Sequence, residues 1–391
     1  MDERWALIEP MRPAPIKPIP TTGLRSAMHP PRTIHKMIPN PNRAQGAGQD
    51  SRKILRRAFS ENGRRSVPFG SHSTRHTTRN RTGGIMANRA RNKPIIGFIG
   101  LGLMGRAFSK NLIADGHRVF GCDPDRAARA KFKRLGGEPA ASPREVAEEA
   151  DIVMISVPNS KISIQASRGK EGFLAFAKEK APALICDTTT ADPEDSRRLA
   201  VMCKKKGVDY LDACVSGHSE NVKNRVGLLI AGGPERAYKK VSPIFGKLLD
   251  DQIYCGSSGS GATMKVLINY LTCLQRCAIA ETIRMGLRSG VKGGILFKAL
   301  HRSAADSRQL RNRGQRMIKR RYTNPVSAVT VLHKDFNLGM SLAKRSKSIT
   351  PIGSASLPFY DEALSSGYGE LDSAVVYKVF EDREKKKKRR R

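Results

Sequence analysis

The chain has 391 residues, of which 71 are Lys or Arg and 35 are Asp or Glu, so its formal net charge is +36. This length is sufficient for two or three domains. Hydrophobic residues make up 39% of the chain, which allows an ordinary core, but no run approaches the roughly 18 uninterrupted apolar residues of a membrane span. We therefore do not expect an integral membrane protein.

The seven cysteines are odd in number and scattered along the chain. They form no Cys-x-x-Cys pair and follow no secretory signal, which argues against both a disulfide framework and a zinc site. We expect reduced thiols, a cytoplasmic location and no metal.

Residues 1–93 are rich in Pro, Arg and Ser and have neither the period of a helix nor that of a strand. They are predicted to be a disordered basic extension, and Met86 is a candidate for the true start of translation. A transit peptide is the alternative, although Asp2 and Glu3 fit it poorly. At the other end, residues 381–391 (EDREKKKKRRR) are expected to form a solvated basic tail.

Strands and helices alternate from Lys93 onward. Short apolar runs predict strands at 95–100, 117–123, 151–158, 183–189 and 208–213. Helical patterns lie between the earlier strands, at 104–115, 125–135 and 143–150. This order is typical of the α/β class and predicts a parallel, doubly wound sheet of the Rossmann type, forming a domain over residues 94–258.

The pattern becomes helical after residue 258. A long connecting helix is expected over 260–289, with a stripe predicted to be buried. The stripe consists of Met264, Leu267, Leu271, Leu274 and Ala278. Further helices are expected at 294–302, 306–319, 328–345 and 359–366. Residues 259–380 are therefore predicted to form an all-α domain.

A glycine-rich motif follows the first strand and opens a helix, and its residues are Gly100-Leu101-Gly102-Leu103-Met104-Gly105. The first glycine permits a tight turn, the second lets a pyrophosphate approach the backbone, and the third lets helix and strand pack closely. Asp123 ends the second strand, where a carboxylate would bind the ribose hydroxyls of NAD. Arg126 leaves NADP possible. Val157 and Pro158, which end the third strand, are also expected to bind the cofactor.

Five segments resemble the β-hydroxyacid dehydrogenase family, which includes 3-hydroxyisobutyrate dehydrogenase, tartronate semialdehyde reductase and 6-phosphogluconate dehydrogenase. They are GFIGLGLMGRAFSKNLIADGHRVFGCD, DTTTADPEDSRRLA, DACVSG, GSGATMKVLIN and KDFNLGM, within about residues 94–380. The resemblance implies an NAD(P)-dependent oxidoreductase that moves hydride between nicotinamide and a small, anionic β-hydroxyacid or its semialdehyde. It also implies a homodimer or homotetramer formed through the helical domain.

Lys265 and Asn269 are four residues apart and so share one helix face. Oxidation of an alcohol needs a base for the hydroxyl proton, and a lysine can serve if burial or nearby cations lower its pKa. The resemblance assigns these roles: Lys265 as general acid and base, and Asn269 as the neighbour that orients it. On spacing alone, both could be ordinary surface residues.

The resemblance also implies a substrate loop in which Ser216 and Gly217 bind the carboxylate of the substrate. Cys214 departs from the proline of the family pattern, and His218 departs from a glycine. His218 either narrows the pocket, adds a donor for a second acidic group, or is an ordinary surface histidine.

Two more positions match the family. Lys334, in the pair Lys334-Asp335, is implied to add positive charge to the substrate site from the helical domain. Thr190 is implied to lie beside the nicotinamide, and the alternative is that it caps the helix that begins near Asp192-Pro193.

The positive charge itself has two interpretations. Residues 302–321 hold eight Lys and Arg against one acid, Asp306, and form either a solvated face or a surface that steers an anionic substrate. A different class of function is a non-catalytic scaffold that binds nucleic acid or other polyanions through its basic arms. An imine reductase of the same fold is a third possibility. Retention of Lys265, Asn269 and Ser216 favours the hydroxyacid enzyme over both.

Overall fold

The computed structural model describes residues 93–389, which lie within one compact unit, Asn80–Arg391. The expectations for the N-terminal extension and for Met86 as the start of translation fall outside the described residues. Within residues 93–389, no helix is both long and apolar enough to cross a membrane.

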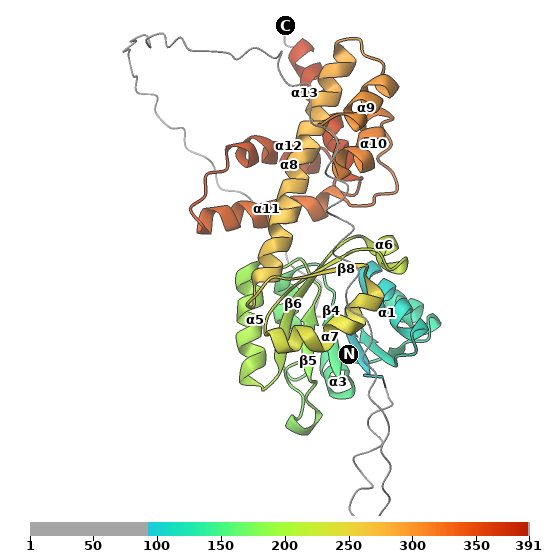
Figure 1. The fold of residues 1–391 in the computed structure, drawn as a ribbon, viewed down its shortest axis with the longest axis vertical. Helices are drawn as coiled ribbons and strands as arrows, with labels where there is room; N and C mark the ends of the chain where they lie inside the picture. The colour runs from blue at the N-terminus through green and yellow to red at the C-terminus, as the bar shows by residue number, and fades with distance from the viewer. Residues whose placement is uncertain (1–92, 390–391) are drawn as a thin grey trace, which may run out of the picture. The chain divides into compact units, whose positions relative to one another are not determined.

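An eight-stranded sheet occupies the first half of the described chain (Figure 1). Its strands are β1 (Ile96–Ile99), β2 (Val119–Cys122), β3 (Glu138–Pro139), β4 (Ile152–Ile155), β5 (Leu184–Asp187), β6 (Asp209–Ser216), β7 (Leu228–Gly232) and β8 (Asp251–Tyr254). Their order is β3-β2-β1-β4-β5-β6-β7-β8, and every neighbouring pair is parallel except β6 and β7. The α/β prediction with a doubly wound sheet is therefore confirmed.

The five predicted strands, in the order β2-β1-β4-β5-β6, pair in parallel as expected, and the one antiparallel pair joins β6 to β7. Only residues 217–227 connect these two strands, and they hold a single short helix, α6 (Ser219–Lys223). A parallel crossover needs a dozen or more residues, so a connection this short returns the chain in the opposite direction. Strands β3, β7 and β8 were not predicted.

Helices cover both faces of the sheet. They are α1 (Leu103–Ala114), α2 (Arg126–Arg134), α3 (Pro143–Glu149), α4 (Ser160–Ala166), α5 (Pro193–Lys205) and α7 (Glu235–Leu248). Successive strand residues point to opposite faces, so Phe98 joins the apolar core with Phe108 and Phe245, whereas Ile99 joins a second core with Leu199. Burial on both faces explains why these strands are continuous apolar runs.

The second half of the described chain is helical. Helix α8 (Ser260–Arg288) runs from the sheet into this region (Figure 1). It is followed by α9 (Gly293–Arg302), the π-helical turn η3 (Leu310–Gly314), α10 (Gln315–Ile318), α11 (Val329–Arg345), α12 (Pro351–Ser365), the 3₁₀ turn η4 (Ser373–Val375) and α13 (Val376–Arg389). A third apolar core lies here, around Phe336, Tyr360 and Tyr377.

Helix α12 is longer than the sequence predicted, and helix α13 was not predicted. Helix α12 starts at Pro351, eight residues before its expected start, and Pro at the first position is favourable there. Helix α13 continues through most of the expected basic tail. Its acidic residues pair with the rest of the helical region, because Glu381 lies 2.6 Å from Arg320 and Glu384 lies 2.7 Å from Arg284.

The predicted orientation of α8 is wrong. Met264, Leu267 and Leu271 were expected to be buried but are 41%, 47% and 54% exposed. The inward face instead carries Lys265, Val266, Cys273, Arg276, Cys277, Ala280 and Ile283. The helical periodicity of the sequence identified the more apolar face of α8. The buried face is a different one, and it contains Lys265 and Arg276.

The N-terminus of α8 is held against the sheet by Asp212 on β6. Its buried carboxylate accepts hydrogen bonds from the backbone N–H groups of Gly259 and Ala262, both at 2.8 Å. A Cβ atom on Gly261 would lie 2.5 Å from the Asp212 carbonyl oxygen, so only glycine allows this close approach. These contacts fix the first turns of α8 beside the carboxyl end of the sheet.

Candidate active site

The glycine-rich turn forms a cradle between β1 and α1. Gly100 has φ +97°, and a Cβ atom there would overlap the carbonyl oxygen of Ser156. A Cβ atom on Gly105 would overlap the carbonyl oxygen of Gly100, so helix and strand touch at this point. Gly102 is different, because nothing lies within 4 Å of the position of its Cβ. This open space lies at the N-terminus of α1, whose first turn holds no acidic side chain, so its amides are available to an anion.

The cradle lies where the order of the strands reverses. Strands β1 and β4 are neighbours in the sheet, and the chain winds outward in opposite directions from them. Ligands of open α/β sheets bind at this point, outside the carboxyl ends of the strands. The Val157 N–H donates a hydrogen bond of 3.2 Å to Oγ1 of Thr189, which joins the loops after β4 and β5. Pro158 is exposed beside it.

Asp123 lies at the end of β2 and supports the glycine turn. Its Oδ2 accepts a hydrogen bond from the Leu101 N–H at 2.7 Å, and its Oδ1 accepts one from the Asp125 N–H at 2.9 Å. Each oxygen retains a further lone pair, so the carboxylate can also accept hydrogen bonds from ribose hydroxyls. Arg126 is exposed at the first position of α2. The residues present therefore fit a dinucleotide.

The other residues of the motif differ in their surroundings. Leu101 is fully buried, Met104 packs against the apolar core that includes Phe98, and Leu103 is largely exposed at the start of α1. Leu101 and Met104 thus anchor the turn, while Leu103 remains accessible.

Lys265 lies in the second turn of α8 and is 8% exposed. Within residues 93–389, no carboxylate oxygen lies within 4.0 Å of its ammonium group. Burial lowers the pKa of Lys265 below its ordinary value of 10.5; the charges of Asp335 and Cys214 oppose this shift, and that of Lys334 adds to it. Its neutral form is therefore more accessible than that of a surface lysine.

A chain of hydrogen bonds lies beside Lys265 and includes a residue that sequence reasoning did not place in the site. The Asn269 Nδ2 donates to Oδ2 of Asp335 at 2.7 Å, and the Lys334 Nζ donates to Oδ1 of Asp335 at 2.7 Å. Lys334 also donates to the carbonyl oxygen of Thr190 at 3.3 Å. Asp335 is buried and joins α8, α11 and the loop after β5. Asp335 follows Lys334 directly in the sequence, but a charged residue in a helix is usually solvated, so nothing in the sequence indicated that it is buried.

Thr190 is not a helix cap. Asp192 caps α5, its side chain accepting a hydrogen bond of 3.0 Å from the Glu194 N–H, and Pro193 occupies the first helical position. Thr190 lies between this cap and β5, where its carbonyl oxygen meets Lys334.

Ser216 and Gly217 lie at the end of β6, half-buried and exposed respectively. Cys214 is not a loop residue: it lies within β6 opposite Ile230 of β7, and its buried thiol donates to the Thr189 carbonyl oxygen at 3.2 Å. This position therefore belongs to a strand, where proline is disfavoured, and not to the predicted substrate loop.

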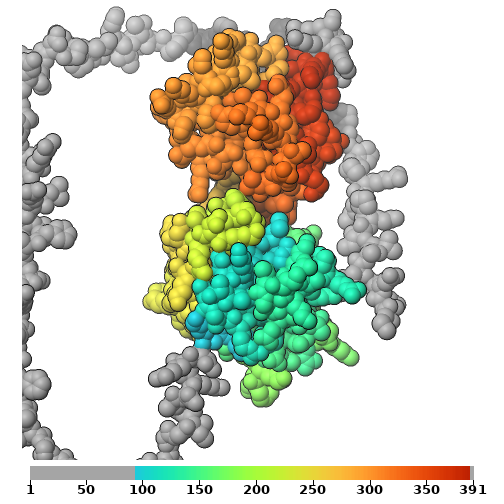
Figure 2. Space-filling view, turned by 90° about the vertical axis from the view of Figure 1, so that its right-hand side faces the viewer, coloured from blue at the N-terminus to red at the C-terminus, as the bar shows by residue number. Residues whose placement is uncertain are grey.

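His218 is the N-cap of α6, and its backbone N–H donates to Oδ1 of Asn221 at 3.2 Å. Its side chain is half-buried. Burial lowers the pKa of His218, and the positive charge of Arg313 lowers it further, so the imidazole is neutral near pH 7. In Figure 2 the yellow-green segment that follows β6 lies between the helical region and the rest of the sheet region.

The basic segment 302–321 is only partly a solvated face. Arg302, Arg308, Arg311, Lys319, Arg320 and Arg321 are exposed. Arg313 is buried, contrary to the interpretation of the whole segment as solvated, and its Nε lies 3.3 Å from Oδ1 of Asp372.

A glycine-rich cradle at the switch point of a doubly wound sheet, in a chain that also holds a buried lysine on α8, is typical of the class of nicotinamide-dependent dehydrogenases. Comparison with known proteins narrows this class. Residues 95–256 match the family model of the NAD-binding domain of 6-phosphogluconate dehydrogenase. Residues 259–380 match the family model described as NAD-binding of NADP-dependent 3-hydroxyisobutyrate dehydrogenase.

Two curated relatives illustrate the similarity. Mitochondrial 3-hydroxyisobutyrate dehydrogenase of Rattus norvegicus is 30% identical over 309 residues, which cover 75% of this chain and 89% of that protein. The 2-(hydroxymethyl)glutarate dehydrogenase of Eubacterium barkeri is 27% identical over 286 residues, covering 73% and 94% of the two chains.

A solved structure agrees with them. The crystal structure of 3-hydroxyisobutyrate dehydrogenase from Salmonella typhimurium aligns with a TM-score of 0.65 and 25% identity, covering 73% of this chain and all of that one. The chain belongs to the 3-hydroxyisobutyrate dehydrogenase family of β-hydroxyacid dehydrogenases, and it is an NAD(P)-dependent enzyme of this type.

Proposed function

We propose that this enzyme interconverts a small, anionic β-hydroxyacid and its semialdehyde, with NAD preferred to NADP. The observation that carries the proposal is the burial of Lys265, with its lowered pKa, beside the chain Asn269–Asp335–Lys334. This arrangement supplies a base and an anion site at the edge of the sheet where the glycine cradle lies.

The proposed cofactor residues are those of the cradle and of the loops around it. They are Gly100–Gly105, Asp123, Val157, Pro158 and Thr190. The amides at the start of α1 would hold the pyrophosphate, and Asp123 would hold the ribose hydroxyls and repel a 2′-phosphate. The bound nicotinamide supplies the hydride acceptor for oxidation and the hydride donor for reduction.

Lys265 handles the proton in this proposal. In the oxidative direction its neutral amine takes the proton of the substrate hydroxyl, and in the reductive direction its ammonium returns a proton to the carbonyl oxygen. Burial favours the neutral form, whereas the charge of Asp335 keeps the ammonium form within reach. A residue that must act as base and as acid needs both forms.

Asn269 orients the reacting groups. Its Nδ2 is engaged by Asp335, so its Oδ1 is left as an acceptor for the Lys265 ammonium or the substrate hydroxyl. Ser216 and Gly217 would bind the substrate carboxylate from the sheet side, and Lys334 would bind it from the helical side. His218 lies next to them.

The exposed apolar stripe of α8 supports a homodimer or homotetramer formed through the helical region. Contiguous exposed apolar residues mark interaction surfaces. The seven free cysteines of the described chain support a reducing compartment such as the cytoplasm.

The test is turnover followed at the absorbance band of reduced nicotinamide, with a panel of β-hydroxyacids and both cofactors. In Lys265→Ala we expect kcat to fall about 10²–10⁴-fold, the usual contribution of general acid-base catalysis. Binding of NADH, followed by fluorescence, should persist. Lys298→Ala, at an exposed lysine of α9, is the matched control and should leave turnover unchanged. Unchanged turnover in Lys265→Ala would remove the proposed acid-base residue.

A further inference from the structure

One side of the helical region carries a surplus of positive charge. Residues 298–321 hold nine Lys and Arg against one acid, Asp306. Five of these cations are exposed and, among residues 93–389, have no carboxylate oxygen within 4.0 Å. They are Lys298, Arg302, Arg308, Lys319 and Arg321. Their charge is therefore not neutralised within the described chain.

The carboxylates next to these cations already have partners. Asp306 lies 3.0 Å from Nδ1 of His301 and 3.5 Å from Arg311. Glu381 of α13 is buried and lies 2.6 Å from Arg320. Neither acid is free to approach the exposed cations, so an anion that neutralises them would have to be a separate molecule.

Two of the five cations line a hollow of about 500 Å³ at the end of α10. The residues that line it are Gln315, Arg316, Lys319, Arg321, Thr323 and Asn324. The Arg316 guanidinium donates to the carbonyl oxygens of Thr323 and Asn324 only at 3.4 Å, and it lies 3.8 Å from Asp372. Its N–H groups thus make only long contacts inside the protein, and they can bind an oxyanion at the surface.

The residue types in the hollow are those that bind phosphate and sugar oxygens of nucleic acids. Arg and Lys supply the charge for this, and Thr, Asn and Gln supply further hydrogen bonds. Among the described residues, no aromatic side chain lines the hollow, so bases would not stack in it. No apolar side chain of residues 93–389 lines it either, so it has nothing to insert into a lipid layer. This composition favours a nucleic-acid backbone over a membrane.

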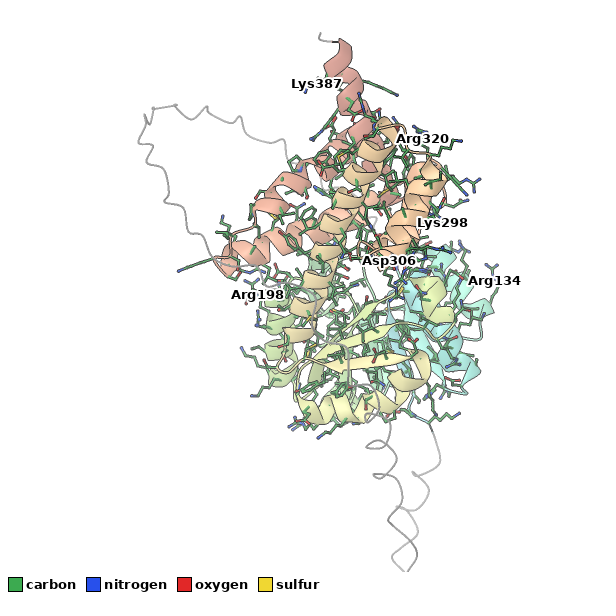
Figure 3. The ribbon with its side chains drawn as sticks, turned by 45° about the horizontal axis from the view of Figure 1, so that its top comes forward. Arg134, Arg198, Lys298, Asp306, Arg320 and Lys387 are labelled. Atoms are coloured by element: carbon green, nitrogen blue, oxygen red, sulfur yellow. The ribbon has the colours of Figure 1, made fainter. Side chains whose placement is uncertain are left out.

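The positive charge continues beyond the hollow. Lys298 and Arg302 on α9 are both exposed, and their spacing of four residues places them on one helix face. Lys387 is exposed near the end of α13. Figure 3 shows Lys298, Arg320 and Lys387 along the same side of the helical region. A row of cations over several elements suits a polymer of phosphates, whereas a single small anion would need only the hollow.

We propose that the hollow, together with Lys298 and Arg302, forms a basic surface that binds the phosphodiester backbone of a nucleic acid without reading its bases. This function is additional to the proposed hydride transfer and does not rest on it. The cations would replace counterions of the phosphates, so the affinity depends on salt. The net charge of +36 would speed the encounter with such a polyanion.

The test is fluorescence anisotropy of the full chain with two labelled single-stranded RNAs of about 20 nucleotides, one of uridine and one of adenosine. We expect similar dissociation constants for both, about 10⁻⁶–10⁻⁴ M near physiological salt, which is the usual range of binding without sequence preference. The affinity should fall steeply between about 50 and 200 mM salt. Absence of binding, or binding of one sequence only, would overturn the proposal. No NAD or substrate is added, so the result is independent of the proposed function.

The double variant Lys319→Gln, Arg321→Gln should bind about tenfold more weakly or less, because two charged contacts are lost. The slope of log Kd against log salt concentration should fall by about 0.7 for each lost phosphate contact. The matched control is Lys204→Gln, Lys205→Gln, which removes the same charge from exposed lysines at the end of α5. Equal weakening in both double variants would show that overall charge and not this surface binds RNA.

Two further measurements separate the basic surface from other contacts with polyanions. Removal of residues 388–391 should weaken RNA binding less than the double variant in the hollow does. Binding that is lost with these four residues and kept in Lys319→Gln, Arg321→Gln would assign it to the C-terminal tail and overturn the proposal. Cosedimentation with phosphatidylglycerol vesicles, without binding to either RNA, would identify a membrane surface and overturn it as well.

Discussion

The side-chain amide of Asn269 donates a hydrogen bond of 2.7 Å to the carboxylate of Asp335, and this contact ties α8 to α11. The other carboxylate oxygen accepts the Lys334 ammonium at the same distance. Asp335 thereby fixes an amide and a cation that come from different helices. It also acts on Lys265, whose pKa is lowered by burial and raised again by this carboxylate.

The lowered pKa of Lys265 predicts the pH dependence of the reaction. Oxidation needs the neutral amine, so kcat/KM for the hydroxyacid should rise with pH through the pKa of Lys265, with a midpoint below 10.5. Reduction needs the ammonium, so kcat/KM for the semialdehyde should fall with pH through the same midpoint. Steady-state rates between pH 5 and 10 measure both limbs. A limb that persists in Lys265→Ala would belong to another group.

Two substitutions beside Lys265 should move that midpoint in opposite directions. Asp335→Asn removes a negative charge that raises the pKa of Lys265, so the rise in oxidation should shift to lower pH. Lys334→Met removes a positive charge that lowers this pKa, so the rise should shift to higher pH. Both variants should also lose activity, but a merely structural defect would leave the midpoint in place. The pH profile of kcat/KM is therefore the measurement, and shifts of the same sign would contradict the assignment.

The sheet could be predicted from the sequence to the extent that its strands are buried on both faces. Runs such as those of β1 and β4 are apolar throughout, and the glycine turn fixes their position. Strand β8 was not predicted, because it is short and alternate residues, such as Ile253, are exposed. The antiparallel direction of β7 follows from the short connection between β6 and β7. The length of this connection could not be known from the sequence before β7 itself was identified.

The sequence predicted those parts of the site whose residue pattern has few other structural roles. The glycine turn could be predicted from its place between a strand and a helix, whereas Lys265 and Asn269 were assigned through the family resemblance, because their spacing alone fits ordinary surface residues equally well. Asp335, Arg276 and Arg313 could not be placed, since a charged residue in a helix is usually solvated. Their burial arises from the packing of α8, α11 and η3, which involves residues far apart in the sequence.

Two glycines of the cradle should respond differently to the same substitution. Gly102→Ala adds a methyl group to open space, so stability should be unchanged, whereas NAD(P) affinity should fall about tenfold or more because the pyrophosphate loses its approach to the backbone. Gly100→Ala introduces a Cβ atom at φ +97° against Ser156 and should lower the free energy of unfolding by about 1–3 kcal/mol. Thermal unfolding and NADH titration of both variants separate these effects. Equal losses of stability would show that Gly102 is structural.

The exposed stripe of α8 leads to a prediction about assembly. Met264, Leu267 and Leu271 present apolar side chains to solvent from a single chain, and burial of each leucine against a second copy would contribute roughly 2 kcal/mol. The wild-type protein should therefore sediment as a dimer or larger, and Leu271→Glu should dissociate it. Val201→Glu, at an equally exposed apolar residue of α5, is the matched control and should leave the mass unchanged. A monomeric wild-type protein would show that the stripe is not an interface, and loss of assembly in both variants would point to added negative charge as the cause.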